Sequence, residues 1–283
     1  MKHFTVILAL FSFMFTTAQT MQRIGDYIES MTFNDPTISE APRVFQYSPE
    51  GDAFVCVNGN NRFTRALYGS NTLFRLETSD RPVFGIYNKN NNKNISFGIS
   101  VNGKYTALDS TDYCKAAFIA GKRDYELKDA AWGNGILKIS ALALPDKDGA
   151  VWKISAEGFP QGTKFECCVD DIRARRLNRN GDMGADPPDS FERAINSGNE
   201  QKSSFELDNK THFLVFEELT LSEKDFVAGA AIYNNAETAR HQLATQVKIE
   251  TPDPFINTLG GVLTTAGDGI WDEIGRASCR ERV

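Results

Sequence analysis

The sequence has few of the side chains that build metal sites. Its 283 residues include five cysteines and three histidines, and no two cysteines form a CxxC pair. Structural zinc sites combine such ligands at short, regular spacings, so we expect no bound metal and no cofactor. The GxSxG, P-loop and GxGxxG motifs are also missing, as is an order of Ser, His and Asp that indicates a catalytic triad. These absences leave the chain without a familiar catalytic motif.

Positive charge is also scarce. The sequence holds 31 Lys and Arg residues against 37 Asp and Glu residues, a net charge of −6. Without the first 18 and last ten residues, which contain Lys2, Arg276, Arg280, Arg282 and Glu281, the counts fall to 27 and 36. Nucleic-acid binding depends on clustered basic residues that neutralise phosphates. We therefore expect no nucleic-acid partner.

Long apolar runs are limited to the N-terminus. The run FTVILALFSFMF is too short to span a bilayer, follows the basic Lys2, and precedes small residues at Thr16 and Ala18. This pattern predicts a signal peptide at residues 1–18, cleaved after Ala18. A buried core helix is the competing interpretation. The signal predicts an exported protein, periplasmic, cell-surface or extracellular, with no membrane span after cleavage.

Short β-favouring runs separated by turn signals fill residues 54–250. Asn-Gly and Asp-Gly sequences favour the positive φ angles of tight turns, so three pairs of runs are predicted to form hairpins. These pairs are FVCV with RFTRALYG, NISFGISV with KYTAL, and ILKISALAL with AVWKISAEG. Leu137, Ile139, Ala141 and Ala143 share one face of the last pair and are predicted to lie in the core.

Later runs, including DFVAGAAIY and HQLATQVKIE, are also interpreted as strands. The pattern therefore predicts a mainly β protein in which residues 19–250 form one large antiparallel β-sandwich. Cys167 and Cys168 are neighbours in a predicted strand and should point to opposite faces. Together with Cys56 and Cys114, they are interpreted as small buried residues, although an oxidising compartment would allow a disulfide.

The pattern changes at residue 251, where a helix is predicted. Asp253 suits the N-cap and Pro254 the first helical position. The apolar residues Phe255, Leu259, Val262, Leu263 and Ala266 then fall on one helical face, while Gly260 and Gly261 allow close packing against another helix. We interpret residues 251–273 as the start of a truncated helical domain, with no partner helix in the rest of the chain. A lone helix that covers the β domain is the alternative.

Residues 274–283, IGRASCRERV, show no helical period, strand alternation or turn chemistry. Codons that encode this segment match a common short-read sequencing adapter. We therefore interpret it as a non-biological artefact, with Glu273 at the junction, and expect the gene product to be truncated there. A basic interaction tail is the competing interpretation.

The most informative polar stretch is DDIRARRLNRNGDMGADPPDSF. It contains Arg176, Arg179, Asp182 and Asp186. Guanidinium groups bind carboxylates in a bidentate geometry, so these four residues are candidate contacts for a uronate-bearing glycan. The alternative is that the arginines of the stretch pair with Asp170, Asp171, Asp182 or Asp186 and only hold an irregular loop.

A second candidate site lies just beyond the predicted helix, at Asp268, Trp271 and Asp272. An indole face can stack on a sugar ring while nearby carboxylates bind hydroxyl groups, and glycoside cleavage uses two carboxyl groups. A helix C-terminal turn with a core tryptophan explains the same residues equally well. The three residues are therefore candidate substrate contacts, and no catalytic residue is assigned.

Three stretches resemble a known protein family: NRFTRALYGSNTLFRLETSDRPVFGIY, RRLNRNGDMGADPPDSF and TPDPFINTLGGVLTTAGDGIWDE. They resemble the N-terminal part of a large exported family of gut Bacteroidetes that carries an uncharacterised domain. That family is similar to six-hairpin glycosidases, in which a β-sandwich precedes an (α/α)6 toroid. The resemblance implies that the predicted helix is the first helix of a toroid. The missing part of this toroid would be the partner domain of the β-sandwich.

The resemblance also implies a function. Relatives of this kind are thought to act on rhamnose- and glucuronate-containing plant glycans, as hydrolases or as lyases. The chain is thus expected to be an inactive fragment of a secreted carbohydrate-active enzyme with a glycan as its ligand. A complete, non-catalytic glycan-binding or surface module is the alternative.

Overall fold

A computed structural model describes residues 46–69, 74–88, 91–174, 177, 187–195 and 197–269. Its strands are β1 (Ser48–Glu50), β2 (Ala53–Val57), β3 (Arg65–Tyr68), β4 (Phe74–Thr78), β5 (Val83–Asn88), β6 (Lys93–Val101), β7 (Lys104–Ala107), β8 (Tyr113–Ile119), β9 (Lys122–Lys128), β10 (Ile136–Ala143), β11 (Gly149–Glu157), β12 (Lys164–Asp171), β13 (Gln201–Glu206), β14 (Thr211–Glu217) and β15 (Thr220–Lys224). The helices are α3 (Phe226–Ala244) and α4 (Pro254–Gly269), with short 3₁₀ turns η1 (Leu108–Ser110), η2 (Ala130–Trp132) and η4 (Pro188–Phe191).

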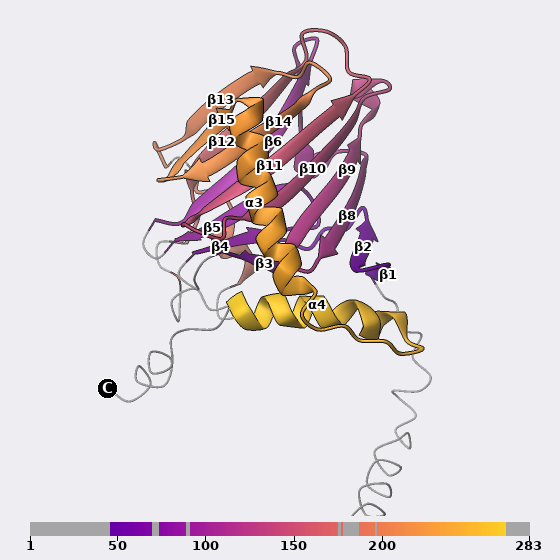
Figure 1. Ribbon diagram of the computed structural model, residues 1–283. Coiled ribbons are helices and arrows are strands. Elements are labelled where there is room, and N and C mark those ends of the chain that lie inside the picture. Colours follow the sequence, from indigo (N-terminus) through magenta and orange to yellow (C-terminus); the bar gives the residue numbers. More distant parts are fainter. Residues whose placement is uncertain are drawn as a thin grey trace, which may run out of the picture. The chain divides into compact units, whose positions relative to one another are not determined.

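The strands form two antiparallel sheets. Sheet A has the order β1-β2-β8-β9-β10-β11-β14-β15, and sheet B has the order β13-β12-β6-β5-β4-β3, with β7 also paired to β6. The inner faces meet in an aromatic core, where the ring of Trp152 in sheet A packs edge-on against Phe84 and Phe97 of sheet B. Figure 1 shows the two layers of strands. The predicted antiparallel β-sandwich is confirmed.

Two of the three predicted hairpins are present. Asn102 and Gly103 have φ angles of 50° and 78° and join β6 to β7, because the tight turn needs positive φ at both central residues. Strand β10 pairs with β11 along its whole length. In β10 the residues predicted to face the core are buried, among them Leu137 and Ile139.

The third predicted hairpin is wrong. Strand β2 pairs with β1 and β8 in sheet A, whereas β3 pairs with β4 in sheet B. The connecting residues include Asn58 and Phe63 at positive φ, so the turn signal is real. It marks a crossing from one sheet to the other, and a local turn pattern does not distinguish a crossing from a hairpin.

The last two predicted strands are also wrong, because residues 226–244 form helix α3. Asp225 caps this helix by accepting hydrogen bonds from the backbone N–H groups of Val227 and Ala228. Gly229, Tyr233 and Ala236 are buried, a helical spacing that places them on one face. That face packs on the outer surface of sheet A (Figure 1), in an apolar cluster completed by Leu142, Leu144, Val151, Phe213 and Val215.

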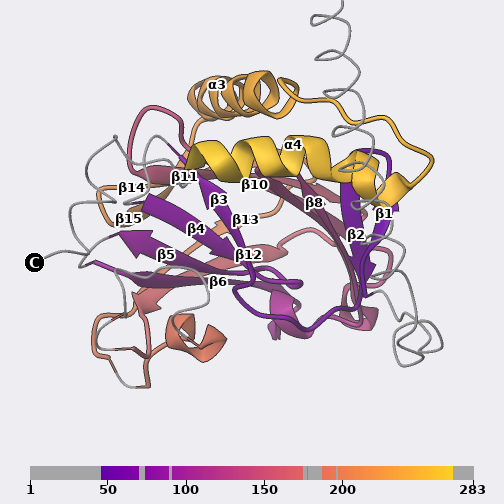
Figure 2. The same ribbon diagram turned by 90° about the horizontal axis from the view of Figure 1, so that it is seen from below.

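Helix α4 forms where the sequence predicts a helix. Asp253 accepts a hydrogen bond from the N–H of Phe255 at 2.9 Å, as an N-cap does. The expectation that α4 has no partner helix is wrong: a methyl group on Gly261 would lie 2.8 Å from the carbonyl oxygen of Ala244, the last residue of α3. The two helices lie on the same side of the strands in Figure 2. No helix within the described residues is both long and apolar enough to cross a membrane.

The buried side of α4 differs from its most apolar side. Thr258 and Thr265 are buried, while Leu259 and Leu263 are 37% and 60% exposed. The helix contacts both β1 and β3, and Thr258 donates a hydrogen bond to the carbonyl of Gly51 beside β1. Part of the apolar stripe therefore faces solvent.

Candidate functional site

Most of the site residues expected from the sequence lie outside the described residues. These are Arg176, Arg179, Asp182 and Asp186 of the arginine-rich stretch, and Trp271 and Asp272 beyond α4. The structure therefore does not test the proposed contacts of these six side chains. It does describe both ends of the arginine-rich stretch and the remaining candidate, Asp268.

The two ends of the arginine-rich stretch are held together against sheet B. The N–H of Arg173 donates to the carbonyl of Glu192, and Arg173 forms an exposed ion pair with Asp189 at 3.3 Å. Phe191 lies on the outer face of β5, where a methyl group on Gly85 would come within 2.7 Å of its ring. Arg62 clamps Glu192 through two hydrogen bonds of 2.5 and 2.7 Å. Asp189 is not one of the four aspartates that the structural alternative names, and two of those four, Asp170 and Asp171, pair with Arg193 and Lys93.

Asp268 is exposed in the last turn of α4 and lines a crevice of about 400 Å³. The walls come from α3, α4, β3 and the end of β10, and most lining residues are apolar, such as Leu243 and Val262. The adjoining Gly269 packs against the ring of Tyr68. Besides Asp268, the polar lining residues include Gln242, Gln246 and Arg240, and Arg240 is bonded to Glu237 and to the carbonyl of Ala120. None of the described residues that line this crevice offers an exposed aromatic ring, so it is a weaker candidate for sugar recognition than a site with an open ring.

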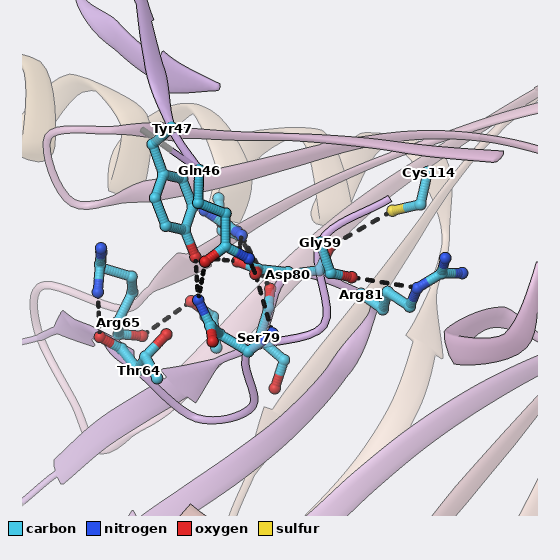
Figure 3. Close-up of polar contacts among 12 residues, drawn as sticks. Gln46, Tyr47, Gly59, Thr64, Arg65, Ser79, Asp80, Arg81 and Cys114 are labelled. Carbon is cyan, nitrogen blue, oxygen red and sulfur yellow. Dashed lines mark hydrogen bonds and ion pairs between the residues drawn. The ribbon is translucent and has the colours of Figure 1, made fainter. Parts of the chain in front are cut away.

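A third place combines many polar residues, but these residues form hydrogen bonds and ion pairs with one another. Asp80, in the turn between β4 and β5, is fully buried and forms an ion pair of 3.0 Å with the buried Arg123 of β9. Tyr47 donates to the same carboxylate at 2.5 Å, and the backbone N–H of Asn61 donates to its other oxygen. Figure 3 shows Tyr47 and Gln46 beside Asp80. Because the carboxylate is enclosed and paired, the cluster closes one end of the core and leaves no room for a ligand.

The strongest candidate is a groove of about 530 Å³ on the outer face of sheet B. We call it the sheet B groove. Its floor and walls come from β6, β7, β12 and β13, which adjoin in the sheet, and from the segment that follows η4. The lining residues are Ser96, Tyr105, Glu166, Cys167, Cys168, Arg193, Lys202, Ser203 and Ser204.

Tyr105 forms the apolar part of the sheet B groove. It stands on β7 opposite Ser100 of β6, and its ring lies directly on Gly98, since a methyl group there would come within 2.1 Å of Cε2. The side chain is nevertheless 53% exposed. Burial of its other half, followed by the nearby carboxylate of Glu166, raises the pKa of Tyr105. The ring is thus fixed against the strand with much of its surface open to the groove.

The polar side chains beside Tyr105 form an ordered set. Arg193 donates to Asp170 at 2.8 Å and also to Glu200, which in turn pairs with Lys202 at 2.9 Å. Ser100 donates a short hydrogen bond to Glu166. These contacts link the guanidinium and the ammonium to Asp170 and Glu200, while Glu166 is bonded to Ser100.

Cys167 and Cys168 occupy opposite faces of β12, as expected. Cys167 is buried in the core, whereas Cys168 is partly exposed in the groove, so the expectation that all four of these cysteines are buried fails at this position. The thiol of Cys168 lies 3.3 Å from Glu200. Burial, followed by this carboxylate, raises the pKa of the thiol, so it is a neutral group at ordinary pH. Cys56, Cys114, Cys167 and Cys168 are all free thiols.

A family comparison places these features in context. The model of a domain of unknown function, DUF4450, matches residues 91–247, more than half of the chain. The chain belongs to the DUF4450 family. No curated protein matches the sequence. The span matched to DUF4450 includes every residue that lines the sheet B groove, and it excludes both Asp80 and Asp268.

Sequence reasoning missed the sheet B groove, although one signal for it was present. The Asn-Gly turn fixes the register of β6 and β7, and this register places Tyr105 on the same face as Ser96 and Ser100. An aromatic residue among serines on one strand face indicates a surface that is polar but not fully solvated. The contributions of β12 and β13 depend on pairing between distant strands, which the local pattern does not show.

Proposed function

We propose that this DUF4450 protein is an exported carbohydrate-active protein whose β-sandwich binds a glycan chain in the sheet B groove. The observation that carries the proposal is Tyr105, a half-exposed ring fixed on Gly98 and surrounded by hydroxyl, carboxylate and cationic groups. The C–H face of a pyranose packs on an aromatic ring, while its hydroxyl groups need both donors and acceptors. The sheet B groove supplies all three.

The fixed geometry of the sheet B groove favours binding further. Arg193, Glu200 and Lys202 are already paired with one another, and a sugar hydroxyl can join this network of donors and acceptors. Its position on paired strands, rather than on a long loop, keeps the polar atoms at constant spacing. A shallow, open groove also suits a polymer, which must enter from the side.

The proposal is tested by affinity electrophoresis of the full chain in gels that contain plant oligo- and polysaccharides with rhamnose and uronate residues. We expect at least one glycan to retard the protein and to retard the Tyr105→Ala variant clearly less, because stacking on one aromatic ring contributes about 1 kcal/mol or more, which is about fivefold or more in affinity. Phe226→Ala removes another exposed aromatic ring, 63% exposed on α3, and serves as the matched control. Absence of retardation by every glycan would overturn the proposal.

A second candidate is that the chain is the front part of a glycan-cleaving hydrolase or lyase, in which α4 is the first helix of a toroid. Its support is the solvent-facing side of α4, where Ile256, Leu259 and Leu263 are 43%, 37% and 60% exposed. Val247, beside them, is 50% exposed. An apolar stripe of this kind suits contact with further helices. The test is an independent reading of the source DNA across the codon of Trp271: a frame that continues through repeated helical hairpins supports this candidate, and a stop after Val283 contradicts it.

A further inference from the structure

We infer that the sheet B groove selects an uncharged pyranose residue and discriminates against a uronate. This inference rests on the proposed glycan binding and assigns the kind of sugar residue that lies on Tyr105. In a chain that mixes acidic and neutral residues, the neutral residue occupies the sheet B groove.

The first argument is that the cations of the sheet B groove are already paired. Arg193 binds Asp170 through Nε and Glu200 through Nη2, and Lys202 binds the second oxygen of Glu200 at 2.9 Å. The pKa of Asp170 is lowered by its hydrogen bonds from Ser197 and Arg193, which outweigh the opposing effect of burial. The carboxylate therefore stays charged. A uronate that approached these cations would compete with protein carboxylates that hold them already.

The second argument is the charge balance. Arg193 and Lys202 face three carboxylates in this region: Asp170, Glu200 and Glu166. The next charged pair along the face, Lys164 and Glu206, is directly opposite in register and adds no net charge. The surplus carboxylate is Glu166, which accepts a hydrogen bond from Ser100 and faces the open groove beside Tyr105.

Glu166 suits a sugar hydroxyl and opposes a second carboxylate. A carboxylate has about four lone-pair sites, and Ser100 uses one of them. Neutral sugars donate hydroxyl hydrogens to the remaining sites, in charge-assisted hydrogen bonds that are stronger than neutral ones. A uronate placed about 4 Å away would be repelled by enough to weaken binding by about fivefold in a fully water-like environment, and by more where the site is partly dry.

The experiment compares matched ligands on the full chain. Uronate-bearing plant oligosaccharides are titrated into the protein beside their carboxyl-reduced counterparts, which keep the linkage and lose the charge, at about 20 mM salt so that screening is weak. The reduced ligands are expected to bind at least about fivefold more tightly. Glu166→Gln should narrow this ratio to about twofold or less. Glu157→Gln, an exposed carboxylate of sheet A, should leave it unchanged.

Two failures are distinguishable. If no member of either ligand set binds, the proposed glycan binding itself is wrong, and the inference falls with it. If the glycans bind but the uronate form binds as tightly as the reduced form or more tightly, glycan binding stands and the discrimination by Glu166 is wrong. If Glu166→Gln left the ratio of the affinities for the reduced and uronate ligands unchanged, Glu166 would not be the cause of the discrimination, and the inference would be overturned.

Discussion

The guanidinium of Arg123 lies 3.0 Å from the carboxylate of Asp80, and both side chains are withdrawn from solvent. Arg123 also donates two hydrogen bonds to the carbonyl of Ser79, which receives a third from Tyr125. The β4–β5 turn of sheet B is therefore tied to β9 of sheet A. Such a pair stabilises the fold relative to an unpaired charge, although an apolar replacement of both partners can be as stable.

Removing one member of this pair should destabilise the sandwich strongly. We expect Asp80→Ala to lower the free energy of unfolding by about 3–5 kcal/mol, because it leaves the guanidinium of Arg123 buried without its counter-charge. Urea denaturation followed by tryptophan fluorescence measures the change. The double variant Asp80→Ala/Arg123→Met should lose less than the sum of the two single variants. Strictly additive losses would show that the two groups do not act as a pair.

The ring of Tyr105 rests on Gly98, so a substitution at Gly98 tests whether the position of the ring matters while the ring itself stays unchanged. A methyl group on Gly98 would lie 2.1–2.4 Å from Cε2, Cζ and Oη of Tyr105, so Gly98→Ala should displace the ring and weaken glycan binding at least tenfold while the protein still folds. Gly267→Ala is the matched control, because nothing lies within 4 Å of its added methyl group. Glycan binding of Gly98→Ala equal to that of the unchanged protein would mean that the ring position does not matter.

The buried Glu77 should give stability a recognisable pH dependence. Burial raises the pKa of its carboxyl above the ordinary value of 4.5, although Arg75 at 3.1 Å opposes this, and its Oε2 has no hydrogen-bond partner. A raised folded-state pKa means that the folded protein holds the proton more tightly than the unfolded chain. Its stabilising contribution is therefore complete below about pH 4.5 and is lost as the pH rises through the folded-state pKa.

The Glu77→Gln variant isolates this contribution. Its free energy of unfolding, relative to the unchanged protein, should rise with pH above about 4.5, by at most about 1.4 kcal/mol per pH unit. Any constant offset from the lost contact with Arg75 does not affect the slope. Denaturation curves between pH 4 and 8 measure it, with Glu157→Gln as an exposed control. A difference that is flat across this range would contradict the raised pKa of Glu77.

The packing of α3 on sheet A rests on Gly229. A methyl group there would lie 2.4 Å from Cβ of Phe213, close to the backbone of β14, so the strand cannot easily yield. We expect Gly229→Ala to cost about 1–3 kcal/mol through overpacking, although alanine is the better helix former. Hydrogen exchange should show faster exchange in α3 with little change in β6 or β12. Gly267→Ala, whose added methyl group meets no atom within 4 Å, should instead stabilise the protein. If Gly229→Ala were also stabilising, α3 would not pack closely on β14 at this point.

The sequence predicted the sandwich because its signals are local. The Asn102-Gly103 turn and the alternation through Leu137 and Ile139 each depend on neighbouring residues, and both are present as predicted. The N-cap of α4 at Asp253 is local in the same sense. These features need no knowledge of which strands meet across the fold.

The failures have a common physical cause. In α3 the apolar run from Phe226 to Tyr233 fits a strand by hydrophobicity, and the Asp225 cap with several alanines favours a helix more strongly than the pattern suggested. Strands β2 and β3 separate because β2 pairs with the distant β8, whereas β3 pairs with the next strand, β4. The sheet B groove also depends on long-range pairing, which brings Glu166 of β12 beside Tyr105 of β7.

Cys168 provides the most direct test of glycan binding in the sheet B groove. Of the four described cysteines it alone is not buried, and it lines the groove beside Glu200. The measurement is the rate of alkylation at Cys168, followed by peptide mass spectrometry at about pH 8.5 with and without the carboxyl-reduced oligosaccharide. The account predicts that glycan slows modification of Cys168 several-fold, and that Tyr105→Ala shifts this protection to a glycan concentration about fivefold higher or more. An unchanged rate at Cys168 under conditions where the glycan is bound would place the ligand elsewhere and contradict the account.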